Sequence, residues 1–168
     1  MILFCTRSSM VEHSPYTRLV LGSSPSACTL NMKIIICGSM TASKEMVEAK
    51  KKLVTLGHEV VLPEFTEEYS EMDTQDEIHR ESAKNKVEYD LVRGCFETIK
   101  NGDAILAVNV ERKGIAGYIG GNSLIEMSFA LVLNKPIYFL HNIPDCNYRD
   151  EIEAMKPIVL NGDFSKIK

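Results

Sequence analysis

Glu126 is the side chain whose surroundings most suggest chemistry in this sequence. It lies within residues 114–136, where a glycine-rich loop leads into an apolar helix that Pro136 stops. Apolar side chains recur there at helical spacing, so we expect one face in the core and Glu126 in the first turn. The positive end of the helix dipole would favour the ionised carboxylate there. Capping of the helix, or pairing with Lys135, are alternative roles for Glu126.

The elements that must position this carboxylate alternate between strand and helix. Short apolar runs, typical of parallel strands buried on both faces, are separated by helical stretches. The longest helical stretch covers residues 76–100, with Gly94 as a candidate interruption. Such β-α-β repeats predict one parallel sheet with helices on both faces. The expected strands are residues 33–37, 59–62, 104–108, 137–140 and 158–160.

The carboxyl ends of two predicted strands lead toward Glu126. Parallel sheets bind ligands at this edge, where the strand order reverses. The turn after residue 37 and the loop of residues 109–122 can therefore converge on one pocket, with the acidic residues 65–76 as its rim or lid. The candidate site residues are Glu126 as the catalytic group and Gly38, Ser39, Asn109, Tyr118, Gly120, Gly121 and Asn122 as substrate-binding groups.

Several binding candidates also have an ordinary structural explanation. Gly38 and Ser39 could form a plain strand-to-helix turn, and Asn122 could cap the helix instead of contacting a ligand. Tyr118 could contact a ligand or be an exposed loop side chain. Asn109 ends a strand that points to the same pocket. The glycines and the start of the helix offer backbone N–H groups to a hydroxyl or a phosphate.

Composition narrows the classes of partner. The 168 residues are 45% hydrophobic and 25% charged, which suits one domain with a substantial core. The net charge of −4, without a basic cluster, argues against a nucleic-acid polymer as partner. No apolar run approaches the roughly 20 residues that cross a bilayer, so we expect no membrane association.

Cysteine and histidine usage argues against a disulfide framework or a metal site. The five cysteines include no CxxC pair, and Cys37 and Cys95 fall in predicted strand and helix, as reduced core thiols of a cytoplasmic protein would. The four histidines are scattered, which suggests neither a metal site nor a catalytic triad. We expect no cofactor.

Residues 1–31 show no strand or helix period, and they resemble a translated transfer-RNA gene. We interpret them as a non-structural extension from a mis-assigned start, with Met32 as the true start and residues 32–168 as the single domain. A genuine disordered tail is the alternative.

Three segments carry a resemblance to a known family. They are Cys37-Gly38-Ser39, the run Asp103-Ala104-Ile105-Leu106, and the pattern Gly-x-Asn-x-x-x-Glu-Met-x-x-Ala that ends in Lys135-Pro136-Ile137. Together they resemble the nucleoside 2-deoxyribosyltransferase superfamily, which includes the 2′-deoxynucleoside 5′-monophosphate N-glycosidases. The resemblance covers most of residues 33–140.

This resemblance implies a fold, a reaction and an assembly. The fold would be a flavodoxin-like, Rossmann-like sheet of five parallel strands, assembled as a homodimer or larger homo-oligomer. Glu126 would attack C1′ of a deoxyribose, expel the base and form a glycosyl-enzyme ester, which suits an oxocarbenium-like centre. Gly38 and Ser39 would contact the sugar or a 5′-phosphate. Asn122 would orient the nucleophile or bind the sugar, and Tyr118 would stack on a base or hydrogen-bond to the carboxylate. The partner would be a small nucleoside or nucleotide.

Two departures from the family keep other functions open. The family has an acidic residue or a serine six positions before the nucleophile, and an aspartate in the preceding helix; here those positions are Gly120 and Cys95. The acid that protonates the leaving base is therefore not identified. One hypothesis is an enzyme that transfers or hydrolyses the glycosidic bond. The alternative is a nucleotide-binding or sensing module without turnover. A flavin binder fits poorly, because residues 41–43 match a flavin phosphate loop only in part.

Overall fold

The sheet contains five parallel strands in the order β2-β1-β3-β4-β5. The computed structural model describes residues 31–72, 74–88 and 90–168. This strand order is flavodoxin-like and confirms the predicted α/β fold. It reverses direction between β1 and β3, whose carboxyl ends therefore flank the switch point. The strands are β1 (Lys33–Gly38), β2 (Glu59–Val61), β3 (Ala104–Val108), β4 (Ile137–Phe139) and β5 (Ile158–Val159).

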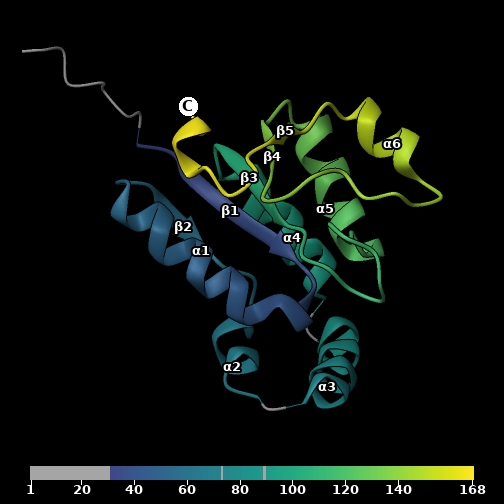
Figure 1. The fold of residues 1–168 in the computed structure, drawn as a ribbon. Coiled ribbons are helices and arrows are strands. Elements are labelled where there is room, and N and C mark those ends of the chain that lie inside the picture. Colours follow the sequence, from purple (N-terminus) through teal and green to yellow (C-terminus); the bar gives the residue numbers. More distant parts are fainter. Residues whose placement is uncertain (1–30, 73, 89) are drawn as a thin grey trace, which may run out of the picture.

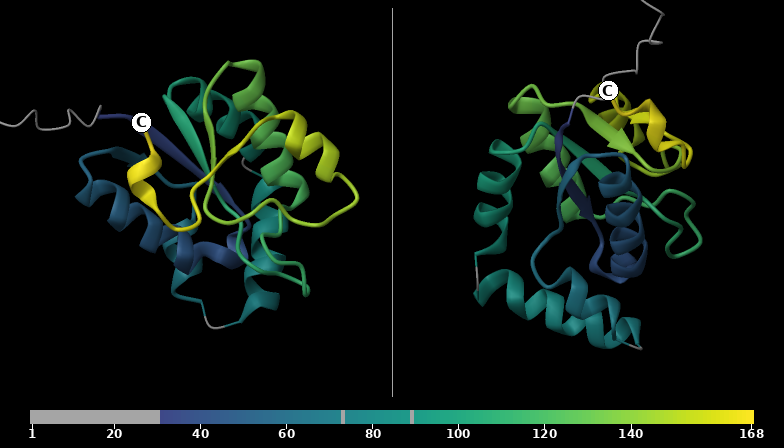
Figure 2. Two further views of the ribbon diagram at one scale, coloured as in Figure 1. Left: turned by 45° about the horizontal axis from the view of Figure 1, so that its top comes forward. Right: turned by 90° about the vertical axis from the view of Figure 1, so that its left-hand side faces the viewer.

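Helices cover both faces of this sheet (Figures 1 and 2). Helix α1 and the C-terminal segment pack on one face, whereas α4, α5 and α6 pack on the other. Helices α2 and α3 lie beyond the carboxyl end of β1. The helices are α1 (Ser43–Thr55), α2 (Thr66–Ser70), α3 (Gln75–Glu88), α4 (Leu91–Lys100), α5 (Gly121–Val132) and α6 (Arg149–Ala154), with short 3-10 turns η1 (Met40–Ala42) and η2 (Phe164–Lys166).

The alternation of side chains along β1 divides the core into two layers. Ile34 and Ile36 face α1, whereas Ile35 and Cys37 face the layer of α4 and α5. All four side chains are almost completely buried. A strand with both faces covered needs apolar residues at every position, which explains the continuous apolar run in the sequence.

Two expected helical boundaries were wrong. The helix predicted over residues 76–100 is two helices, α3 and α4, and the break lies next to Asp90 instead of Gly94. Asp90 has φ of 47°, a left-handed conformation that stops a helix, whereas Gly94 continues within α4. The stretch of residues 65–76, expected to be irregular, contains the short helix α2.

Helix α5 also begins earlier than predicted, which moves Glu126 out of the first turn. Gly120 is the N-cap and Gly121 the first helical residue, so Asn122 does not cap the helix and no acidic residue lies in its first turn. Because the dipole effect decays within the first turn, it contributes less to the ionisation of Glu126 than the sequence suggested.

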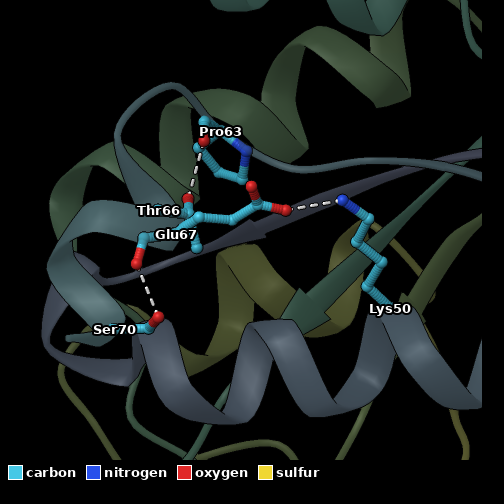
Figure 3. A network of polar contacts seen from close by, with 5 residues as sticks. All are labelled: Lys50, Pro63, Thr66, Glu67 and Ser70. Atoms are coloured by element: carbon cyan, nitrogen blue, oxygen red, sulfur yellow. Dashed lines mark hydrogen bonds and ion pairs between the residues drawn. The ribbon is translucent and has the colours of Figure 1, made fainter.

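Side-chain bonds stabilise the segment around α2 and join it to α1 (Figure 3). The hydroxyl of Thr66 donates to the carbonyl oxygen of Pro63 at 2.7 Å. The hydroxyl of Ser70 donates to the backbone carbonyl oxygen of Glu67 at 2.6 Å. Lys50 of α1 pairs with Glu67 at 2.8 Å. Solvent-exposed ion pairs add little stability, so the buried Thr66 bond is the stronger restraint. These contacts restrain the segment that follows β2, and the ion pair joins it to α1.

Within the described residues, no helix has both the length and the apolar character needed to cross a bilayer. The extension predicted over residues 1–31 lies outside the described range, apart from its last residue, so its interpretation stays a prediction.

Candidate functional site

Glu126 lines a cavity of about 280 Å³ beside the carboxyl ends of β1 and β2. Helices α4 and α5 form its other side, and Tyr69 of α2 reaches it from the segment expected to be a rim or lid. The volume lies just below the range of about 300–1,000 Å³ that is typical of small-molecule sites. The cavity therefore suits one small ligand.

Most of the cavity wall is apolar. The polar groups on it include two carboxylates, Glu64 and Glu126, and among the described lining residues none is lysine, arginine or histidine. Glu64 is exposed and Glu126 is half-buried. Apolar walls with few polar groups suit the apolar part of a small ligand, and the few polar groups fix its orientation. The apolar lining side chains include Ile35, Met40, Val61, Leu62, Leu91, Val92, Ile125 and Phe129.

Contacts between α4 and α5 hold Glu126 in this wall. The thiol of Cys95 donates to Glu126 Oε1 over 3.4 Å. One residue further along α4, the ring of Phe96 meets that of Phe129 edge-on, with centroids 5.2 Å apart. Lys135, the alternative ion-pair partner of Glu126 in the sequence, donates instead to the carbonyl oxygen of Gly102.

The charge of Glu126 raises the pKa of two cysteine thiols. Burial raises the pKa of the Cys95 thiol, and the charge of Glu126 and the hydrogen bond to it raise it further. Cys37 on β1 is completely buried, and its pKa is raised by burial first and then by Glu126 and Cys95. Both thiols therefore stay protonated at neutral pH. The described free cysteines are Cys37, Cys95 and Cys146.

The loops after β1 and β3 do converge, as predicted, through a contact that the sequence did not suggest. Arg112 donates to the hydroxyl of Ser39 at 2.7 Å, and Ser39 and Thr41 share a hydrogen bond of 2.9 Å. The Arg112 guanidinium also lies 5.8 Å from the centre of the Tyr118 ring. Ser39 immediately precedes Met40, which lines the cavity. Ser39, Thr41 and Arg112 themselves are not among the described residues that line the cavity.

Asn109 braces the loops at the carboxyl edge. It is completely buried, and its amide nitrogen lies 3.3, 3.1 and 2.9 Å from the carbonyl oxygens of Gly117, His141 and Asn142. Its side-chain oxygen accepts from the backbone N–H of His141 at 2.8 Å. All of these partners belong to the protein backbone, and Asn109 is not among the cavity-lining residues.

The remaining predicted site residues fall into two groups. Asn122 is exposed and lines the cavity with Glu126. Gly38 is buried and packed closely: a Cβ there would lie 3.2 Å from the Met46 sulfur and 3.3 Å from the Val108 oxygen. Its lack of a side chain therefore serves packing. Ser39 and Tyr118 in the loops, and Gly120 and Gly121 at the start of α5, are not among the described residues that line the cavity.

A second, more open groove of about 650 Å³ lies on the other side of the loop after β3. It is lined by residues 114–117 together with His141, Asn142 and Arg149. The Arg149 guanidinium is already paired with Glu153 at 2.8 Å. We place the candidate site in the smaller cavity, because the partly buried carboxylate Glu126 lies there.

Sequence reasoning missed three residues that line or adjoin the cavity. Cys95 reads as a core thiol in the sequence, although its position matches a family aspartate. Glu64 follows the short strand β2, and Arg112 lies in a polar loop. Only for Cys95 did the sequence contain a signal, namely its place in the family pattern.

Comparison of the chain with protein-family models, with curated proteins and with solved structures found no match. Among residues 31–72, 74–88 and 90–168, no group of three or more histidine, cysteine, aspartate or glutamate side chains is arranged to hold a metal ion. The function is therefore argued from the cavity itself.

Proposed function

We propose that this protein is an N-glycosidic bond enzyme that acts on a small nucleoside or nucleotide, with Glu126 as the nucleophile. The observation that carries the proposal is the position of the Glu126 carboxylate in the wall of a mostly apolar cavity of about 280 Å³. The apolar wall suits a nucleobase, and the carboxylate suits the sugar carbon that becomes positively charged as the base departs. The family resemblance supports the same assignment.

The reaction would proceed in two steps. A Glu126 oxygen bonds to C1′ as the C1′–N bond breaks, and the bonding electron pair leaves with the base, which gains a proton. The resulting ester is then attacked at C1′ by water or by a second base, which releases Glu126 as a carboxylate. Water gives hydrolysis, whereas a second base gives transfer. In either case the attacking group loses its proton.

Glu64 is our candidate for the acid that protonates the departing base. It is the other carboxylate among the described lining residues, and it comes from the segment after β2, whereas Glu126 comes from α5. Glycosidases commonly combine a nucleophilic carboxylate with a separate acid. The Cys95 thiol is a poor alternative, because its raised pKa makes it a weak acid.

The position of Arg112 favours a substrate that carries a 5′-phosphate. Its guanidinium and the hydroxyls of Ser39 and Thr41 form one cluster, and Ser39 and Thr41 flank the cavity-lining Met40 in the sequence. Guanidinium and hydroxyl donors are common phosphate ligands, and the loop after the first strand is the usual phosphate position in sheets of this order. We therefore propose a nucleoside monophosphate as the preferred substrate class.

The remaining features of the proposal concern assembly and compartment. We expect a homodimer or larger homo-oligomer in the cytoplasm. The exposed apolar side chains on α5 support self-association, since Ile125, Leu131 and Val132 are 43%, 45% and 78% exposed. Light scattering of the purified protein tests this expectation, and a monomer at micromolar concentration would contradict it.

The direct test is release of free base from a panel of 2′-deoxynucleosides and their 5′-monophosphates. We expect release by the wild-type protein and at least about a 100-fold loss in Glu126→Gln, which is similar in shape but not nucleophilic. Glu97→Gln is the matched control, because Glu97 is exposed on α4 and should retain the rate. Addition of a second free base distinguishes transfer from hydrolysis. If no free base is released from any of these substrates, the proposed enzymatic function is wrong.

A binding or sensing module is the second candidate. The family's acidic positions are occupied by Gly120 and Cys95, and Glu64 is exposed, so Glu126 has no buried second carboxylate among the described lining residues. Calorimetry with the same panel tests this module. Tight binding without base release, unchanged in Glu126→Gln, would favour it over the enzyme.

A further inference from the structure

The carboxylate of Glu126 is contacted from α4 by a neutral sulfur group. Cys95 Sγ lies 3.4 Å from Glu126 Oε1, with the thiol as donor. Both side chains line the same cavity, so the contact lies at the site and not in the closed core. A second thiol, Cys37, lies on β1 in the layer of the core that α4 and α5 cover. The Cys37 thiol donates to the carbonyl oxygen of Ile35 at 4.0 Å, whereas the Cys95 thiol donates to the carboxylate.

A thiol has different consequences from the other groups that could stand there. A lysine or arginine would neutralise the carboxylate, and a second carboxylate would repel it. A thiol is a weak, uncharged donor, so it can orient one oxygen while the negative charge remains available for attack. Burial of Cys95 and the nearby charge of Glu126 both oppose loss of the thiol proton, which keeps the donor in place.

We infer that Cys95 is a positioning residue for Glu126: its thiol holds Oε1 by a hydrogen bond and thereby orients the carboxylate toward the cavity. The kinetic consequence rests on the proposed function, whereas the coupling between thiol and carboxylate does not.

The coupling is tested by thiol reactivity in the full chain, without any substrate. Wild type and Glu126→Gln are treated with iodoacetamide between pH 7 and 9.5, and each cysteine is followed by peptide mass spectrometry. Alkylation needs the thiolate, so removal of the neighbouring charge should speed reaction of Cys95 about tenfold, the effect of one pKa unit. Cys146, which is absent from the cavity wall, is the internal reference and should change less than about twofold. Equal rates for Cys95 in the two proteins would overturn the inference.

The positioning role is tested by two substitutions of Cys95. In single turnover with a substrate that the wild type cleaves, Cys95→Ala should slow base release about three- to tenfold, as expected for one lost hydrogen bond, with substrate affinity within about twofold. Cys95→Ser keeps a donor and should recover most of the rate. Equal losses in both variants, or a change confined to affinity, would mean that Cys95 only fills space. Thermal unfolding establishes that both variants are folded.

The two tests fail separately. A protein that cleaves no substrate but shows the coupled thiol reactivity would refute the proposed function and leave the Cys95–Glu126 interaction standing. A protein that cleaves substrate but shows no coupling would refute the positioning role alone.

Discussion

Replacement of Asn109 by aspartate should destabilise the protein strongly, because it removes one donor group from a buried cluster of carbonyl oxygens. The amide nitrogen lies within 3.3 Å of three backbone oxygens, and it carries two hydrogens to share among them. Aspartate has nearly the same shape and keeps the acceptor for His141 N–H. The perturbation is therefore the loss of about two hydrogen bonds plus repulsion between oxygens. At about 1 kcal/mol for each bond and about 1–2 kcal/mol for the repulsion, we expect a loss of about 3–4 kcal/mol.

The assay is urea unfolding of Asn109→Asp at pH 7, with Asn101→Asp as the matched control. Asn101 makes one comparable bond, from its amide to the carbonyl oxygen of Glu97 at 2.9 Å, but it is exposed. We expect the control to lose less than about 1 kcal/mol. With an m-value of about 1–3 kcal/mol/M, the Asn109→Asp midpoint should fall by about 1 M or more.

The same variant should show a specific pH dependence. The folded state favours the protonated form of the introduced carboxyl group, since a carboxylic acid can donate to a carbonyl oxygen and a carboxylate cannot. The folded pKa of this group would then lie above its unfolded value of about 3.9, so stability is lost as pH rises from about 4 toward the folded pKa. A loss of less than about 1 kcal/mol at pH 7, or a loss equal to that of the control, would refute our account of Asn109.

Three further predictions concern the loops and the pH response of the wild type. Gly117→Ala should destabilise by about 2 kcal/mol more than Gly114→Ala, because both glycines have positive φ but only at Gly117 would a Cβ collide with the backbone; thermal unfolding compares them. Burial lowers the pKa of His58, so the unfolding free energy should fall as pH drops below about 6.5 toward the folded pKa, and His58→Gln should flatten that slope. Arg112→Gln should raise KM about tenfold for monophosphates and not for nucleosides, whereas Lys113→Gln, at an exposed neighbouring position, should change neither. Equal destabilisation by Gly117→Ala and Gly114→Ala would contradict the first prediction, and an unchanged pH dependence of stability in His58→Gln would contradict the second. A raised KM for nucleosides in Arg112→Gln would contradict the third.

The order of strands and helices could be predicted because the signals are local. The continuous apolar run of residues 33–37 indicates a strand that is buried on both faces. Pro136 indicates that the helix preceding it in the sequence has ended. The boundaries were less predictable. The break at Asp90 depends on one left-handed residue in a stretch without proline, and glycine at position 94 was the more obvious interruption.

The side-chain contacts of the site could not be predicted from local patterns. Cys95 and Glu126 are 31 residues apart in the sequence, and Ser39 and Arg112 are 73 apart. Only the packing of α4 on α5, and of one loop on another, brings these groups together. For Asn109 the local pattern suggested a contact that the structure does not contain. A polar residue at the end of a strand suggests a ligand contact, whereas the side chain of Asn109 bonds to backbone groups.

The central claim is that Glu126 bonds covalently to the sugar. The most direct measurement is intact-mass analysis of the full chain, quenched with acid during turnover of a cleaved substrate, followed by peptide sequencing of the modified segment. Our account predicts an added deoxyribosyl mass on the peptide that contains Glu126, and its absence in Glu126→Gln. Base release without any adduct, or an adduct on another residue that persists in Glu126→Gln, would contradict the account.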